Sequence, residues 1–78
     1  MNKTRRKLLE SVIDKLTDIK NDIEAIADEE REAYDNLPEN LQNTAKAEAM
    51  DYNADTLCQA CDDVDDIIGE LEAVLDNE

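Results

Sequence analysis

The chain of 78 residues is long enough for one small domain, and it carries a formal net charge of −14 from 22 acidic and 8 basic residues. This charge argues against direct nucleic-acid binding, which needs a basic surface to replace the counterions on phosphate, and it opposes contact with anionic lipid. One Gly, one Pro, two Tyr and no Phe or Trp are poor material for a β-sheet, so the composition favours helices.

Neither a membrane span nor a secretory signal is expected. No apolar run approaches the roughly 20 residues that cross a bilayer. The N-terminus is basic, but Glu10, Asp14 and Lys15 interrupt the apolar residues that follow it. A secretory signal has an uninterrupted apolar segment. With only two cysteines as well, the sequence predicts a protein of the reducing cytoplasm.

In the first half of the chain, apolar residues recur at alternating spacings of three and four. The series is Leu9, Val12, Leu16, Ile19, Ile23, Ile26, Glu30, Ala33 and Leu37. Only Glu30 in this series is polar. A sustained mean spacing of 3.5 residues is typical of a coiled-coil seam and predicts a helix over about residues 5–36. Thr4 is the expected N-cap of this helix, with Asn2 as the alternative.

A stop signal follows this series. Pro38 disfavours the helical conformation in the residue before it, so the first helix should end near Asn36. Pro38 also favours a short new helical turn through Leu41. Asn43 or Thr44 is then expected to cap a second helix.

Residues 37–43 are therefore predicted to form a turn, and two interpretations of it remain open. In one, Tyr34, Leu37 and Leu41 simply close the end of the core. In the other, the turn is a recognition tip. The residues of such a tip would be Tyr34, Asn36, Leu37, Pro38 and Leu41.

The second half repeats the pattern without a break. Its series is Ala47, Met50, Ala54, Leu57, Cys61, Val64, Ile68, Leu71 and Leu75. This predicts a helix over about residues 44–76. Folding the chain back near Gln42 matches the two seams along their whole length and places Leu9 opposite Leu75. The predicted fold is all-α, a coiled-coil-like antiparallel two-helix hairpin forming a single domain over residues 1–78.

Further apolar residues lie beside the two seams. They are Leu8, Ile13, Ala27 and Tyr34 in the first helix, and Ala60, Ile67 and Val74 in the second. A stripe wider than a seam indicates more than one neighbour. We expect a homodimer that forms a four-helix bundle. The alternative is that the spare apolar face binds a different protein.

Charge is segregated along the chain. From Glu48 to Glu78 there are eleven acidic residues and no basic one. In a hairpin, the basic residues Lys3, Arg5, Arg6 and Lys7 should lie near Glu72, Asp76 and Glu78. The other acids are either a solvated face that keeps the protein soluble, or a surface for a basic groove that imitates the phosphates of DNA. The residues proposed for such a surface are Asp62, Asp63, Asp65, Asp66 and Glu70.

Motifs for catalysis or metal binding are weak. Cys58 and Cys61 match the C-x-x-C pattern, but their mid-helix position beside two aspartates disfavours a thiolate, and a zinc site would need two further ligands. The acidic run 62–66 continues the helical repeat and lacks the glycine of a calcium loop. There is no His, and Gly69 stands alone, so no phosphate-binding loop is present. We expect no catalytic residue, no metal site and no cofactor.

The segment DEEREAYDNLPENLQ, residues 28–42, and the basic start NKTRRK resemble a group of short acidic helical proteins from phages, prophages and conjugative elements of Gram-positive bacteria. The second helix shares only their acidic, heptad character. The resemblance implies no residue roles. Small acidic phage proteins often bind and block host machinery, including antiviral defence complexes, and the resemblance extends that expectation to this chain.

These observations predict a protein that is not an enzyme. The expected function is stoichiometric inhibition, through the acidic surface, of a host nucleic-acid-handling or antiviral defence protein. The alternative is a structural or assembly part of a mobile element, in which the helical bundle has no inhibitory role.

Overall fold

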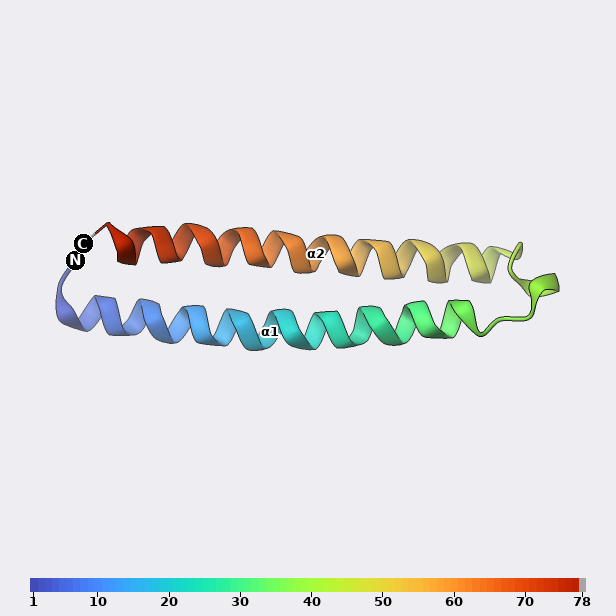
Figure 1. Ribbon diagram of the computed structural model, residues 1–78, viewed down its shortest axis with the longest axis horizontal. Coiled ribbons are helices and arrows are strands. Elements are labelled where there is room, and N and C mark those ends of the chain that lie inside the picture. Colours follow the sequence, from blue (N-terminus) through green and yellow to red (C-terminus); the bar gives the residue numbers. More distant parts are fainter. Residues whose placement is uncertain (78) are drawn as a thin grey trace.

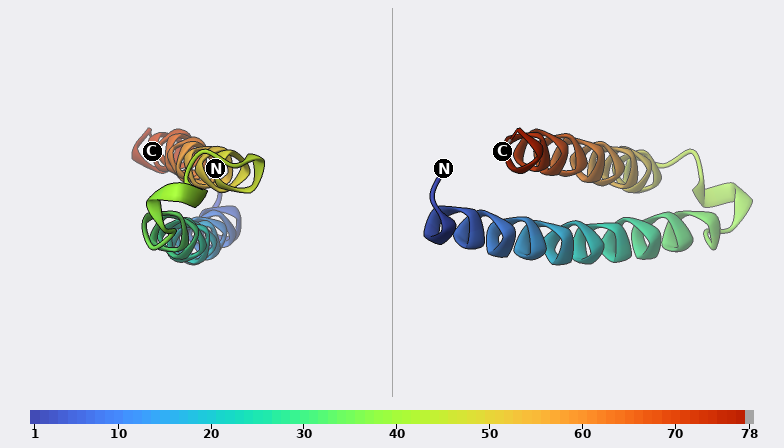
Figure 2. Two further views of the ribbon diagram at one scale, coloured as in Figure 1. Left: turned by 90° about the vertical axis from the view of Figure 1, so that its right-hand side faces the viewer. Right: turned by 60° about the vertical axis from the view of Figure 1, so that its left-hand side comes forward.

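The described residues, 1–77, form a helical hairpin in the computed structural model (Figure 1). Helix α1 spans Lys3–Asp35, a short 3-10 helix η1 spans Glu39–Leu41, and helix α2 spans Ala45–Asp76. The two long helices lie side by side and antiparallel, with both chain termini at one end (Figures 1 and 2). The Cα atoms extend over 59 × 15 × 13 Å. The prediction of an all-α two-helix hairpin is confirmed, and each helix begins and ends within two residues of the expected position.

The N-cap of α1 is Asn2 and not Thr4. The backbone of Asn2 is extended, and its Oδ1 accepts a hydrogen bond from the N–H of Arg5 at 2.8 Å. The carbonyl of Asn2 also accepts from the N–H of Arg6 at 3.0 Å, so the helix starts two residues before Thr4 would allow. Asn and Thr are both good caps, and local sequence preference did not separate them. The cap of α2 is Thr44, whose Oγ1 accepts from the N–H of Ala47 at 3.2 Å.

The connection between the helices is held by hydrogen bonds within itself. Pro38 has the extended backbone (φ −58°, ψ 148°) that ends α1, and its carbonyl then accepts from the N–H of Leu41 at 2.8 Å. The side-chain amide of Gln42 donates to the carbonyl of Leu37 at 3.2 Å. The hydroxyl of Thr44 donates to the carbonyl of Leu41 at 2.7 Å. The short helical turn expected after the proline is therefore present as η1.

The seam predicted for α2 is correct. Its residues are buried or half-buried in alternating steps of three and four from Ala47 to Leu75. The buried members are small or medium in size: Ala47, Ala54, Cys61 and Ile68, which are 0–8% exposed. From α1, only Ala27 is equally buried. Small side chains at the contact let two helices approach closely.

The seam predicted for α1 is half wrong. The column containing Leu9, Leu16, Ile23, Glu30 and Leu37 does face α2. Its companion column is not Val12, Ile19, Ile26 and Ala33, which are exposed. The companion column consists instead of Arg6, Ile13, Lys20, Ala27 and Tyr34.

The reason for this rotation of α1 lies in the contacts it makes with α2. Leu9 and Ile23 are each followed by an apolar residue both three and four positions later, so at these turns either spacing satisfies a seam. With the observed rotation, Lys20 Nζ lies 3.0 Å from Asp65 Oδ1. Arg31 also reaches two carboxylates of α2, at 2.7 Å and 2.6 Å.

The cross-helix contacts agree with a chain folded back near Gln42. At the open end, Arg6 Nη1 donates to the carbonyl of Leu75 at 3.1 Å. In the middle, the thiol of Cys61 lies 3.8 Å from the carbonyl oxygen of Lys20. Glu78, which was expected beside the basic N-terminus, lies outside the described residues. Neither α1 nor α2 has an apolar stretch long enough to cross a membrane.

Candidate partner-binding surfaces

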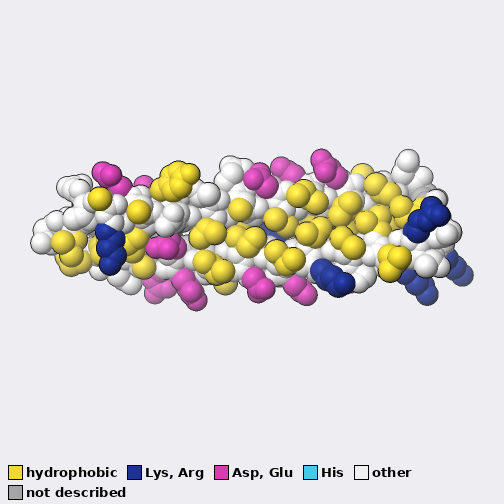
Figure 3. All heavy atoms as spheres, turned by 180° about the vertical axis from the view of Figure 1, so that it is seen from behind, with side chains coloured by type: hydrophobic (Ala, Val, Ile, Leu, Met, Phe, Trp, Pro, Cys, Tyr) yellow, Lys and Arg dark blue, Asp and Glu magenta, His cyan; other side chains and the backbone are white. Residues whose placement is uncertain are grey.

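One side of the hairpin is apolar along most of its length. Its residues come one position before residues that face the other helix, such as Ile19 before Lys20 and Ile67 before Ile68. Because the helices are antiparallel, these positions of the two helices lie on the same side of the hairpin. We call this the apolar face; it comprises Leu8, Val12, Ile19, Ile26 and Ala33 of α1, and Ala60, Ile67 and Val74 of α2. In Figure 3 the hydrophobic atoms form a continuous band over both helices on this side.

The apolar face is far from buried within the hairpin. Ile19 is 48% exposed, Ile26 is 54% exposed and Ile67 is 45% exposed. Val12 and Val74, nearer the open end, are 43% and 42% exposed. Isolated exposed hydrophobic residues are normal on proteins, whereas a contiguous band usually marks a binding surface.

The opposite side of the hairpin is acidic. We call it the acidic flank; its carboxylates are Glu24 and Asp28 of α1, and Asp51, Asp55, Asp62 and Asp65 of α2. Two cations bridge the helices here. The hydrogen bond to Asp65 raises the pKa of Lys20, so this ammonium stays charged. Arg31 binds Asp51 and Asp55, and its guanidinium also lies over the ring of Tyr34, 5.6 Å from the ring centre.

A hollow of about 350 Å³ opens on the acidic flank between the helices. Its lining is Lys20, Glu24, Ala27 and Asp28 from α1, and Cys58, Cys61 and Asp62 from α2. Burial, with a further contribution from the charge of Glu24, raises the pKa of the Cys61 thiol. That thiol is therefore a poor nucleophile at neutral pH. Among residues 1–77 there is no group of three or more His, Cys, Asp or Glu side chains placed to hold a metal ion.

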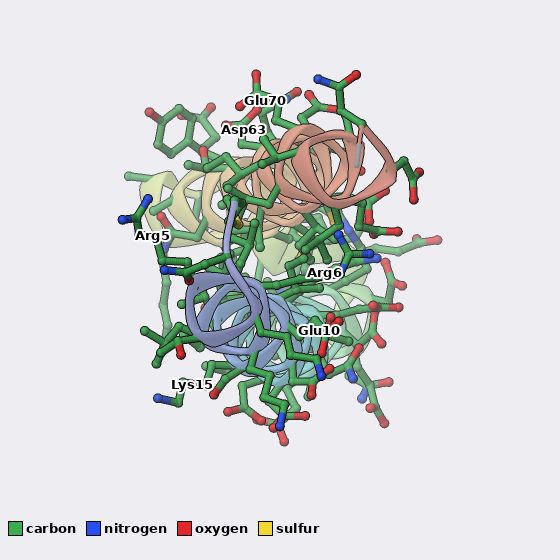
Figure 4. All side chains as sticks on the ribbon, turned by 90° about the vertical axis from the view of Figure 1, so that its left-hand side faces the viewer. Arg5, Arg6, Glu10, Lys15, Asp63 and Glu70 are labelled. Carbon is green, nitrogen blue, oxygen red and sulfur yellow. The ribbon has the colours of Figure 1, made fainter. Side chains whose placement is uncertain are left out.

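The five predicted acidic residues do not form one flat surface. Asp65 is paired with Lys20, and Asp62 lines the hollow. Asp63 accepts a hydrogen bond from the side-chain amide of Gln59 at 3.0 Å. In the end-on view, Asp63 and Glu70 point away from α1 (Figure 4). All five are exposed, and they wrap around the outer half of α2.

Four of these five residues remain available for a partner. We call them the outer acidic row; they are Asp62, Asp63, Asp66 and Glu70. None of the four forms an ion pair within the described part of the chain. The bridged Asp65 is less available, because a partner would have to displace Lys20.

Three of the five residues of the predicted recognition tip, Asn36, Pro38 and Leu41, are exposed. Tyr34 and Leu37 are half-buried, and Asn36 ends α1 with its N–H donating to the carbonyl of Glu32 at 3.0 Å. Pro38 and Leu41 are exposed, although the backbone of both takes part in the hydrogen bonds of η1. These contacts fit a turn that closes the end of the core.

Lys20 and Arg31 were not singled out from the sequence. Each directly follows a residue of the predicted seam and resembles an ordinary flanking charge. A usable signal was present, since folding the chain back near Gln42 brings Lys20 opposite Asp65 and Arg31 opposite Asp51 and Asp55. A lysine or arginine at the helix contact, facing an acid in the predicted register, would have indicated which column of α1 faces α2.

Comparison of the chain with family models, with curated proteins and with solved structures found no match.

Proposed function

We propose that this protein is a non-enzymatic, cytoplasmic protein of phage or mobile-element type that binds a basic host protein through its acidic surface. The bound protein would be a nucleic-acid-handling or antiviral defence factor, and binding would inhibit it stoichiometrically. The observation that carries the proposal is the outer acidic row, whose carboxylates lie exposed and without ion pairs in the described structure of a long helix.

The spacing of charge on α2 supports this proposal. From residue 62 to residue 76 the helix rises by about 21 Å at 1.5 Å per residue. Apart from Asp65, which is bridged to Lys20, six carboxylates lie on this stretch, or about one per 3.5 Å, against one phosphate per 3.4 Å along a single strand of duplex DNA. Their positions are 62, 63, 66, 70, 72 and 76. A groove of Lys and Arg that grips nucleic acid would meet a comparable charge density here.

The charge on this helix is also difficult to explain by folding alone. Asp62 and Asp66 are one turn apart, as are Asp66 and Glu70, and like charges at this spacing destabilise a helix by a few tenths of a kcal/mol. No basic residue of α2 lies nearby to offset them. A solvated face that keeps the protein soluble would not need so dense a row.

The best test combines affinity capture with a matched pair of variants. Tagged protein would be mixed with a Gram-positive lysate at low and at high salt, and the eluted partner tested for binding to duplex DNA. The outer-row variant is Asp62→Asn, Asp63→Asn, Asp66→Asn and Glu70→Gln. The control variant removes the same charge from α1, with Asp14→Asn, Asp18→Asn, Asp22→Asn and Glu29→Gln.

The proposal requires a partner that binds DNA, leaves at high salt, and is lost with the outer-row variant but kept with the control. It also requires that the protein block the partner's DNA binding at a molar ratio near one. Equal loss in both variants would mean that only total charge matters, and it would count against a specific surface.

A second candidate function is that of a structural or assembly part of a mobile element. The observation that favours it is the half-exposed apolar face, which a helical bundle would cover. In either case we propose that two hairpins associate into a homodimeric four-helix bundle. The structural function would survive the outer-row variant, and the inhibitory one would not.

A further inference from the structure

We infer that the apolar face is the surface on which a second copy of this chain packs, so that the dimer buries this face and carries an acidic flank on each of its two outer sides. This inference rests on the proposed homodimer and identifies its interface. It does not depend on whether the acidic surface inhibits anything.

The core of the hairpin is small. The buried hydrophobic residues are Ala27, Ala47, Ala54, Cys61 and Ile68, and within residues 1–77 no large side chain is fully buried. A chain of this length has little apolar surface to remove from water by itself, and its stability is correspondingly marginal. A surface that completes the core must be present whenever the chain folds. Another copy of the same chain meets this condition, whereas an occasional partner does not.

The apolar face has the area of a small stable interface. At 1.5 Å per residue, its stripe on α1, from Leu8 to Ala33, is about 38 Å long, and its stripe on α2, from Ala60 to Val74, is about 21 Å long. With each helix roughly 10 Å wide, the footprint is about 600 Å² on each copy, at the lower end of what one partner contributes to a stable interface. The face is therefore just large enough for a dimer.

The apolar face suits pairing with itself. The register set by the contact of Lys20 with Asp65 places Ile19 of α1 and Ile67 of α2 at about the same level along the rod. One heptad towards the open end, the equivalent positions are Val12 and Val74, so the two halves of the face present similar side chains. A two-fold interface needs a surface that is complementary to its own copy.

Burying this face has a consequence for the acidic flank. The flank lies on the other side of the helix contact, where Lys20 and Arg31 bridge the helices. Two hairpins joined through their apolar faces thus turn their acidic flanks away from each other. Since each copy carries a net charge of −14, added salt should tighten the dimer by screening repulsion. Binding of a basic partner should weaken under the same change.

The test is sedimentation equilibrium of the untagged full chain at 50 mM and 500 mM NaCl. We expect a mass of twice 8.8 kDa, with tighter association at the higher salt. A monomer of 8.8 kDa at 100 μM protein and 500 mM NaCl would overturn the inference.

A variant pair locates the interface. Ile19→Glu with Ile67→Glu places two carboxylates on the apolar face and should raise the dimer dissociation constant by roughly 100-fold or more, because burying unpaired charge is costly. Ala25→Glu with Tyr52→Glu adds the same charge to exposed positions outside the face and should leave the dimer within a few-fold of the parent. Equal effects of the two pairs would reject the apolar face as the interface.

A third measurement guards against loss of folding in the first variant. Ile19→Cys, in a chain that also carries Cys58→Ala and Cys61→Ala, keeps the face apolar and adds one thiol. A thiol cross-linker with a flexible arm should join two copies of the Ile19→Cys chain to each other. In a one-to-one mixture with a second chain that carries Ile67→Cys instead, it should also join the two different chains. Cross-linking no faster than that of Ala25→Cys would contradict the inference. The outer-row variant should still dimerise, so failure of the proposed inhibition would leave this result unchanged.

Discussion

The apolar face and the acidic flank are made by the same two helices, yet they are stabilised in different ways. On the acidic flank two cations hold the helices together, because Lys20 and Arg31 join α1 to three aspartates of α2. On the apolar face nothing within the described hairpin covers Ile19, Ile26 or Ile67, which stay about half exposed. The difference shows that the ion pairs accompany one particular rotation of the two helices, while much of the apolar surface stays exposed in the hairpin.

The largest effect on stability is expected from a comparison of two adjacent residues, one in the seam and one on the apolar face. Ile68 is 7% exposed and Ile67 is 45% exposed. Ile68→Ala should lower the free energy of unfolding by about 2–4 kcal/mol, because it leaves a cavity between the helices. Ile67→Ala should cost the isolated hairpin less and weaken association of two copies more. Urea unfolding followed by circular dichroism, with sedimentation on the same samples, measures both. If both variants lowered the free energy of unfolding equally and neither weakened association, the two positions would not differ in their contacts.

A smaller effect, of opposite sign, is expected at Gly69. This residue lies in α2 with a helical backbone, and a Cβ atom added to it would meet nothing within 4 Å. Gly69→Ala should therefore stabilise the protein by about 1 kcal/mol through helix propensity alone. Thermal unfolding would show the gain as a higher midpoint. A loss of stability, or a loss of dimer, would mean that another chain approaches the backbone at this point.

The bridging cations should matter mainly at low salt. Arg31→Gln removes both ion pairs to α2, and because the side chain is partly exposed we expect a modest drop in the thermal midpoint that fades as NaCl is raised. Lys46→Gln is the matched control, because Lys46 forms no ion pair in the described structure. A drop that persisted in high salt would show that Arg31 contributes through packing on Tyr34 and not through charge.

The smallest expected effect is a loss of stability at alkaline pH. Burial raises the pKa of Cys61 above its ordinary value of 9.0 in the folded chain, so the unfolded chain ionises this thiol first. The corresponding stability is fully present below pH 9 and declines as the pH rises above it. The thermal midpoint of the parent should thus fall more steeply between pH 8.5 and 10 than that of Cys61→Ala. Parallel profiles would indicate that the thiol is solvated.

Much of the fold could be predicted from the sequence, and the two helices show where prediction stops. In α2 the apolar residues favour one alternation of three and four, and the observed seam is the predicted one. In α1, Leu9 is followed by Val12 three positions later and by Ile13 four positions later, and both are apolar. Leu16 is followed in the same way by Ile19 and Lys20. Apolarity favours Ile19 of this second pair, whereas the structure places Lys20 at the helix contact.

Of the two candidate surfaces, one could be predicted from the sequence and the other could not. The acidity of α2 and the exposure of the outer acidic row are evident from composition and helical spacing. The residues of the apolar face could not be identified from the sequence, because the apolar spacing assigns Val12, Ile19 and Ile26 to the seam. Their true position depends on the rotation of α1, and Lys20 and Arg31 are the residues whose partners reveal it.

The sequence by itself determined that this chain is helical, where it turns and how the two helices align, because periodicity, Pro38 and the capping residues are local signals. Only the tertiary structure decided which side of α1 meets α2. That choice depends on contacts between residues far apart in the chain, such as Lys20 with Asp65, whose energy no local pattern contains. The same choice decided which hydrophobic residues of α1 are buried against α2 and which, such as Ile19 and Ile26, stay exposed.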